Sequence, residues 1–152
     1  MYLRILVPID GSEASERGLK EATALARALG ARVRLVHVLN KTPWLYSGAP
    51  TEVIDQLLDQ LRSTGETIIH EATTALRAAG IEVDHRLIEA PGERAGEFIV
   101  AEAQDWPAEL IVCGTHGLRG LRRVLMGSDA EYIVSRSPVP VLLVRAPKAP
   151  AA

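Results

Sequence analysis

The chain has 152 residues, of which 47% are hydrophobic and 24% charged, and a formal net charge of −2 at pH 7. Its length allows one compact domain with a core but not two ordinary domains, and the composition is that of a folded rather than a disordered protein. The net charge argues against a nucleic-acid partner, and the lone cysteine excludes an internal disulfide. No apolar run approaches the roughly 20 residues that span a bilayer. We therefore expect a soluble cytoplasmic protein with no membrane partner.

The first part of the chain predicts a strand, a helix and a second strand. Leu3–Ile9 is mostly apolar and β-branched, with Arg4 as its only charged residue, as expected of a strand buried on both faces of a parallel sheet. Ser12 is the expected N-cap of a helix that continues to Leu29, and Gly30 is its expected C-cap. Val33–Val38 is the second strand.

A long helix is predicted in the middle of the chain. The segment Leu39–Pro50 shows neither helical nor strand periodicity and is interpreted as a loop. Thr51–Ala79 carries an apolar stripe at helical spacing, and Gly80 ends it. Gly65, inside this helix, marks either a bend or a break between two helices.

The rest of the chain predicts three strands and two helices. Polar and apolar residues alternate in Ile81–Ile88, which indicates an edge strand with one wet face. A helix over Gly92–Ala103 precedes a central strand at Leu110–Cys113. A last helix over Ser128–Ser135 precedes a final strand at Val139–Val144, which we place at the other edge of the sheet because its Pro140 cannot donate to a ladder.

Alternating strands and helices predict an α/β fold with a parallel sheet, right-handed crossovers and helices on both faces. We expect one domain over residues 1–146, followed by a disordered tail over residues 147–152.

The segment between the central strand and the last helix has the chemistry of an anion site. It reads GTHGLRGLRRVLMGS from Gly114 to Ser128. Glycine amides can wrap around an anion, and a helix N-terminus attracts negative charge. Ser128 and Glu131 form a capping-box pattern at that N-terminus. The glycines and arginines that could contact phosphate are Gly114, Gly117, Gly120, Gly127, Arg119, Arg122 and Arg123.

On residues alone, this segment could equally be a flexible connection. It is neither a P-loop nor a G-x-G-x-x-G turn after the first strand. Asp10 could be only a turn former, and Ser128 only a helix cap. His116 is the histidine best placed to contact phosphate. The other three histidines and the cysteine are interpreted as structural or surface residues, namely His37, His70, His85 and Cys113.

The spacing of the glycines resembles a known signature. Gly114-x-x-Gly117, nine residues and then Gly127-Ser128 is similar to the ATP-binding motif of the universal stress protein family. Four segments resemble that family's first, second, fourth and fifth strands, in this order: Ile5–Ser12, Leu35–Val38, Leu110–Gly117 and Ser137–Val144.

This resemblance implies a Rossmann-like (adenine nucleotide α-hydrolase-like) sheet of five strands in the order 3-2-1-4-5. It implies ATP as the ligand, with Mg²⁺ as a plausible companion and no dedicated protein metal site. Asp10 would contact the ribose, Pro8 and the backbone of Val38 the adenine, and Gly117, Gly127 and Ser128 the phosphates. Gly114, His116, Arg119 and Gly120 complete the candidate site. Asp129 departs from the expected pattern, since it adds a negative charge beside the phosphates.

The resemblance also implies a homodimer that pairs the Val139–Val144 edge strands, with an unknown regulated protein as a further partner. The leading hypothesis is an ATP-binding sensor or regulator with slow or no ATPase activity, because the sequence shows neither a catalytic base nor a Walker lysine. One alternative is a nucleotide hydrolase or nucleotidyl-transfer enzyme that uses His116 or Asp129. Another is a dimerisation module that binds no nucleotide.

Overall fold

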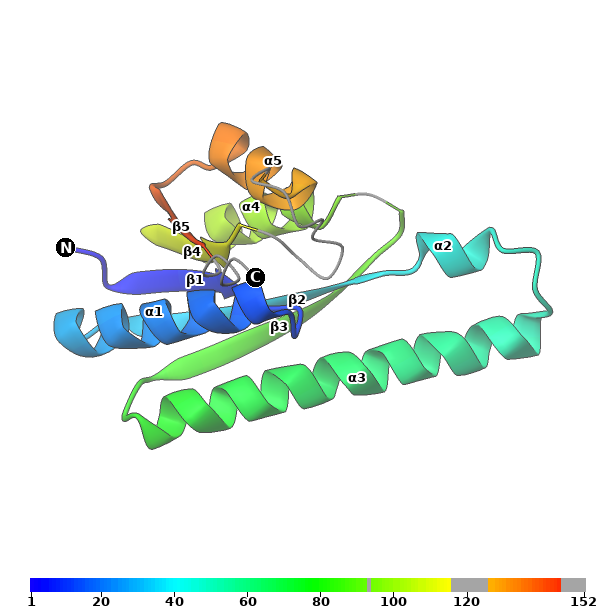
Figure 1. The fold of residues 1–152 in the computed structure, drawn as a ribbon, viewed down its shortest axis with the longest axis horizontal. Helices are drawn as coiled ribbons and strands as arrows, with labels where there is room; N and C mark the ends of the chain where they lie inside the picture. The colour runs from blue at the N-terminus through cyan, green and yellow to red at the C-terminus, as the bar shows by residue number, and fades with distance from the viewer. Residues whose placement is uncertain (93, 116–125, 146–152) are drawn as a thin grey trace, which may run out of the picture.

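A computed structural model describes residues 1–92, 94–115 and 126–145. Its centre is a five-stranded parallel sheet in the order β3-β2-β1-β4-β5, as expected from the sequence and the family resemblance (Figure 1). The strands are β1 (Arg4–Pro8), β2 (Arg32–Asn40), β3 (Val83–Ala90), β4 (Leu110–Gly114) and β5 (Val141–Val144).

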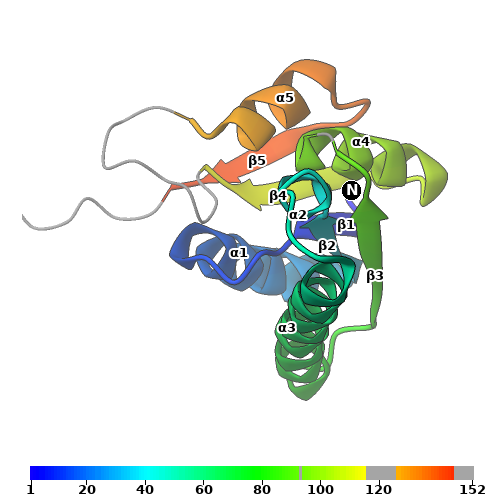
Figure 2. The same cartoon turned by 90° about the vertical axis from the view of Figure 1, so that its right-hand side faces the viewer.

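Two layers of helices cover the sheet. Figure 2 shows α1 and α3 on one face and α4 and α5 on the other. The helices are α1 (Glu13–Leu29), α2 (Thr42–Leu45), α3 (Thr51–Ala78), α4 (Ala95–Asp105) and α5 (Ser128–Arg136). No helix in the described part of the chain is long and apolar enough to cross a membrane.

The core consists of two clusters, one on each face of the sheet. Ile5 and Val7 of β1 belong to the cluster under α1 and α3, whereas Leu6 belongs to the cluster under α4 and α5. All three are fully buried. Because alternate side chains of a strand point to opposite faces, burial on both faces explains why Ile5, Leu6 and Val7 form an uninterrupted apolar run.

The predicted caps of the first helix are confirmed. Ser12 accepts a hydrogen bond from the Ser15 N–H at 3.2 Å, and Gly30 adopts the left-handed conformation, with φ of +65°, that ends a helix. The predicted loop after β2 is wrong in one part, because Thr42–Leu45 forms the single turn of α2.

The long helix is continuous through Gly65, so the predicted alternative of a break between two helices is wrong. A Cβ at Gly65 would lie 2.7 Å from Cδ2 of His37, which is on β2. The glycine therefore lets the helix backbone approach the sheet closely at this residue.

The remaining elements are those predicted, with shifted boundaries. β3 begins two residues later than expected, α4 begins three residues later, and β5 begins only after Pro140. β3 and β5 are the two edges of the sheet, as predicted. The wet face of β3 carries Asp84, which pairs with Arg34 of β2 at 2.7 Å.

Candidate functional site

The candidate site lies at the carboxyl edge of the sheet, where β1 and β4 are neighbours. From β1 the chain crosses to β2 on one side, and from β4 it crosses to β5 on the other side. Ligands of open α/β sheets bind at such a switch point, beyond the carboxyl ends of the strands. The segments that leave β1 and β4 are therefore the first places to look for ligand contacts.

The segment after β1 holds Asp10 in a tight turn. The Ser12 N–H donates to Oδ1 of Asp10 at 2.9 Å, and the Asp10 N–H donates to Oγ of Ser15 at 3.0 Å. Gly11, with φ of +79°, reverses the chain between them. Asp10 is thus the turn former that its sequence suggested, and its carboxylate is half-buried at the carboxyl edge.

The start of α1 lies against the end of β4. A Cβ on Gly114 would be 2.5 Å from the carbonyl oxygen of Ala14, and a Cβ on Gly18 would be 3.2 Å from the Gly114 nitrogen. Backbone therefore meets backbone here, and the Asp10 turn is next to the point where the chain leaves β4. Gly114 is needed for this close packing, a role that the sequence did not reveal.

The stretch from Gly114 to Ser128, called the glycine segment below, has its two ends joined by a backbone hydrogen bond. The Gly127 N–H donates to the Thr115 carbonyl at 2.7 Å, and the Thr115 N–H donates to the Val144 carbonyl at 3.1 Å. The two ends of the segment are thereby held together beside β5. The Gly127 N–H is already used in this contact and so is not available to a phosphate. Gly127 could instead leave room for a phosphate because it has no side chain.

The predicted capping box at α5 is wrong. Gly127 is the N-cap, with ψ of 152° and no side-chain capping bond, and Ser128 is the first helical residue. The amides of Ser128, Asp129 and Ala130 consequently occupy the first three helical positions, where a helix has no internal acceptor for an N–H. These amides and the exposed Ser128 hydroxyl are what α5 offers to an anion.

The Asp129 carboxylate faces α4. Its Oδ1 accepts the Gly96 N–H at 3.0 Å, and a Cβ on Gly96 would lie 3.0 Å from the Asp129 carbonyl oxygen. A carboxylate at the start of α4 is favoured by the positive end of that helix. The negative charge that departs from the expected pattern therefore has a structural partner.

β2 extends beyond β1 at the same edge of the sheet. The last β1 pair joins Pro8 to Val36, and the Ile9 N–H donates to the Val36 carbonyl at 2.8 Å. Backbone groups alternate in direction along a strand, so those of Val38 also point to the side of β1, past its end. Val38 could thus present both an N–H and a C=O to a ligand, and the half-buried Pro8 ends β1 beside Val36.

A charged cluster lies where β2 and β3 end. Glu89 of β3 forms ion pairs with Lys41 and with Arg62 of α3, the latter at 2.7 Å between Oε1 and Nε. These two cations, Arg62 first, lower the pKa of Glu89 from 4.5 to about 2. These ion pairs link α3 to the ends of β2 and β3. The sequence did not predict this cluster.

Six candidate residues lie outside the described part of the chain, namely His116, Gly117, Arg119, Gly120, Arg122 and Arg123. Of the other histidines, His37 is buried, and His70 and His85 are exposed. Burial raises the pKa of the Cys113 thiol to about 11, in keeping with the predicted inert packing role. Among the described residues, no three His, Cys, Asp or Glu side chains group in a way that could hold a metal ion.

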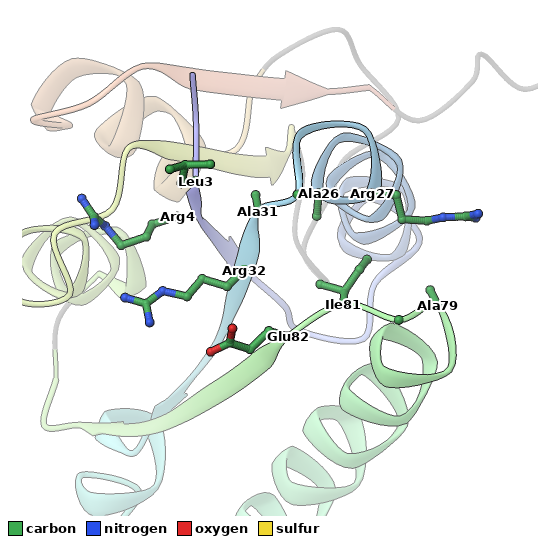
Figure 3. A pocket seen from close by; sticks show the side chains of 11 residues that line it. Leu3, Arg4, Ala26, Arg27, Ala31, Arg32, Ala79, Ile81 and Glu82 are labelled. Atoms are coloured by element: carbon green, nitrogen blue, oxygen red, sulfur yellow. The ribbon is translucent and has the colours of Figure 1, made fainter.

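A pocket of about 570 Å³ lies at the opposite, amino edge of the sheet (Figure 3). It is formed where α1 and α3 end, at Gly30 and Gly80. Helix C-termini carry partial negative charge and so disfavour an anion. Arg32 lies 5.5 Å from the Trp106 ring centroid, and the Arg27 side chain extends away from Arg32 in Figure 3. This pocket is therefore a poorer phosphate site than the carboxyl edge.

Comparison with known proteins gives a consistent result. The model of the universal stress protein family matches residues 1–145. Universal stress protein MJ0531 of Methanocaldococcus jannaschii is 33% identical over 149 residues, which cover 97% of this chain and 85% of that protein.

Two solved structures are also similar. The structure of MJ0577 from the same archaeon has a TM-score of 0.87 at 28% identity and covers 98% of this chain and 99% of that one. A universal stress protein of Archaeoglobus fulgidus, solved in complex with dAMP, has a TM-score of 0.63 at 26% identity, with 93% and 97% of the two chains covered.

Proposed function

The chain belongs to the universal stress protein family, and from this premise we propose that it binds an adenine nucleotide, ATP in particular, at the carboxyl edge of the sheet. The observation that carries the proposal is the close approach of Gly114 to Ala14, which brings the Asp10 turn beside the exit of β4. The dAMP complex of the Archaeoglobus fulgidus protein, 26% identical to this chain, supports an adenine nucleotide as the ligand.

Each end of the nucleotide has suitable partners in this proposal. Asp10 accepts hydrogen bonds from the ribose hydroxyls, since a carboxylate accepts several donors. The backbone N–H and C=O of Val38 pair with the adenine edge, with Pro8 beneath the ring. The phosphates meet the amides at the start of α5 and the hydroxyl of Ser128.

The glycine segment completes the phosphate contacts in this proposal. Gly114 and Gly127 mark the two ends of the segment. The residues between them that would contact phosphate are Gly117, Gly120, His116 and Arg119. Their roles rest on the resemblance of the glycine spacing to the ATP-binding motif of the family.

Mg²⁺ fits this proposal only as a companion of the phosphates. The Asp129 carboxylate accepts the Gly96 N–H of α4. It is thus engaged away from the start of α5, where the phosphates would bind in this proposal. Mg²⁺ commonly keeps several waters and binds through substrate phosphates, with one or two protein ligands at most. Ser128 is the side chain best placed to be such a ligand.

We propose a regulatory rather than a catalytic role, with slow or no ATPase activity. Asp129, which with His116 is one of the two residues that a hydrolase could use, is engaged with α4 through Gly96. A nucleotide-dependent regulator also needs a surface for a partner. The β5 edge, where Leu142 is 36% exposed, supports a homodimer formed by antiparallel pairing of two such strands.

The test is to denature freshly purified protein and identify any released nucleotide by mass spectrometry. Calorimetric titration of the nucleotide-free protein with ATP, with and without Mg²⁺, then gives the affinity. We expect a single adenine-nucleotide site per chain and slow or no ATP turnover. Rapid hydrolysis would contradict the regulatory role. A monomer in size-exclusion chromatography at micromolar concentration would contradict the dimer.

A further inference from the structure

The peptide group that joins Ile9 to Asp10 is held at both ends by buried side chains. Its carbonyl oxygen lies 2.7 Å from Nδ1 of His37, and its N–H donates to Oγ of Ser15 at 3.0 Å. A carbonyl oxygen only accepts hydrogen bonds, so Nδ1 of His37 carries the proton. Since His37 and Ser15 are 8% and 7% exposed, water cannot readily replace either contact.

The orientation of this peptide group decides where the Asp10 carboxylate lies. Rotating the group changes ψ of Ile9 and φ of Asp10 together, and hence the direction of the Asp10 side chain. In the described part of the chain, the one hydrogen bond to that carboxylate reaches Oδ1, from the Ser12 N–H. Oδ2 is then the oxygen that a ligand can use.

His37 is itself held from the far side. A Cβ on Gly65 would be 2.7 Å from its Cδ2 and 3.0 Å from its Nε2, so the imidazole is in contact with the backbone of α3. The ring therefore cannot move away from Ile9 in that direction. Ser15 is equally constrained, because it lies in the first turn of α1 and its own N–H donates to Oγ of Ser12.

We propose that Ser15 and His37 are positioning residues for the nucleotide site, which act by holding the Ile9–Asp10 peptide group so that Asp10 faces the ribose. This inference rests on the function proposed above. Neither side chain touches the nucleotide. Their effect on affinity passes through Asp10 and disappears when the Asp10 carboxylate is removed.

A double-mutant cycle tests this, because two residues that act through one contact give non-additive effects. ATP is titrated calorimetrically into wild type, Ser15→Ala, Asp10→Ala and the double variant. Ser15→Ala removes the hydroxyl but keeps the backbone bond to Ser12. We expect it to weaken ATP binding about tenfold in the wild-type background and less than about twofold beside Asp10→Ala.

The control is Ile81→Val, a core truncation at the amino edge of the sheet. Its urea midpoint shows how far a general loss of stability affects binding, and we expect ATP affinity within about twofold of wild type. Unchanged affinity in Ser15→Ala, or an equal loss with and without the Asp10 carboxylate, would overturn the proposal.

His37 is tested by comparing two variants. Asparagine keeps an N–H donor at the δ position, whereas leucine has none. We expect His37→Asn to bind ATP at least about threefold more tightly than His37→Leu. Equal affinities of the two folded variants would remove His37 from the proposal. If wild type binds no ATP, the proposed function fails. If wild type binds ATP but the effects of Ser15→Ala and Asp10→Ala are simply additive, only the positioning role fails.

Discussion

Gly114 approaches Ala14 so closely that a Cβ on the glycine would lie 2.5 Å from the Ala14 carbonyl oxygen and 2.9 Å from its Cβ. Atoms of the α1 backbone thus occupy the space that any side chain at the end of β4 would need. This contact sets the distance between the Asp10 turn and the start of the glycine segment, and the candidate site depends on it.

Gly114→Ala is expected to destabilise the protein by about 2 kcal/mol, because backbone atoms cannot give way as a flexible side chain can. Gly18→Ala is the matched control, since its Cβ would meet the Gly114 nitrogen at a more tolerable 3.2 Å. Urea unfolding measures both free energies. An equal or larger loss in Gly18→Ala would contradict this interpretation of the contact.

Gly65→Ala sets two effects against each other. Alanine in place of glycine inside a helix stabilises by about 1 kcal/mol. The new Cβ would lie 2.7 Å from Cδ2 of His37, a buried ring held by the Ile9 carbonyl. We expect the clash to outweigh the helix propensity, with a net loss of about 1 kcal/mol in the free energy of unfolding. A more stable variant in thermal or urea unfolding would show that the ring can move.

Cys113 should be almost inert in the native protein, because burial raises its pKa to about 11. At pH 8 the thiolate population is then lower by about 100-fold than for an ordinary cysteine, before access is considered. The measurement is the rate of reaction with an aromatic disulfide reagent in buffer and in urea. A native thiol that reacts as fast as the unfolded one would contradict the burial of β4.

Glu89 should stabilise the protein at neutral pH and lose that effect in acid. Its pKa is lowered from 4.5 to about 2, first by Arg62 and then by Lys41. A lowered pKa in the folded state means that the stabilisation is complete above about pH 4.5 and disappears as the pH falls toward 2.

The comparison is with Glu89→Gln in urea unfolding at several pH values. Because the Glu89 side chain is 31% exposed, we expect a difference of only about 1 kcal/mol at pH 7, reduced further by salt. A difference that stays constant or grows in acid would contradict the ion-pair assignment.

The sequence predicted the layers of the fold because burial leaves a clear pattern. The β1 residues after Arg4 are all apolar since Ile5 and Leu6 are buried on opposite faces, and β3 alternates since Asp84 is on a solvent-exposed face. The order of the strands came from the resemblance to a family. The single turn of α2 was missed because four residues are too few to show a period.

The candidate site was harder to predict because its contacts join distant parts of the chain. The capping box at Ser128 failed because the helix begins there with Gly127 as its N-cap, while Asp129 binds Gly96, 33 residues earlier. Likewise, nothing local links His37 to Ile9, which are 28 residues apart. Local patterns name candidate residues, whereas packing decides which partners each one has.

The most direct test of the nucleotide site is calorimetric ATP titration of wild type beside three variants. Asp10→Ala and Gly127→Val alter the carboxyl edge, and Arg27→Ala alters the pocket at the amino edge. We expect both carboxyl-edge variants to lose at least about tenfold in affinity and Arg27→Ala to bind like wild type. Full affinity in the first two, or its loss in Arg27→Ala alone, would contradict a nucleotide site at the carboxyl edge.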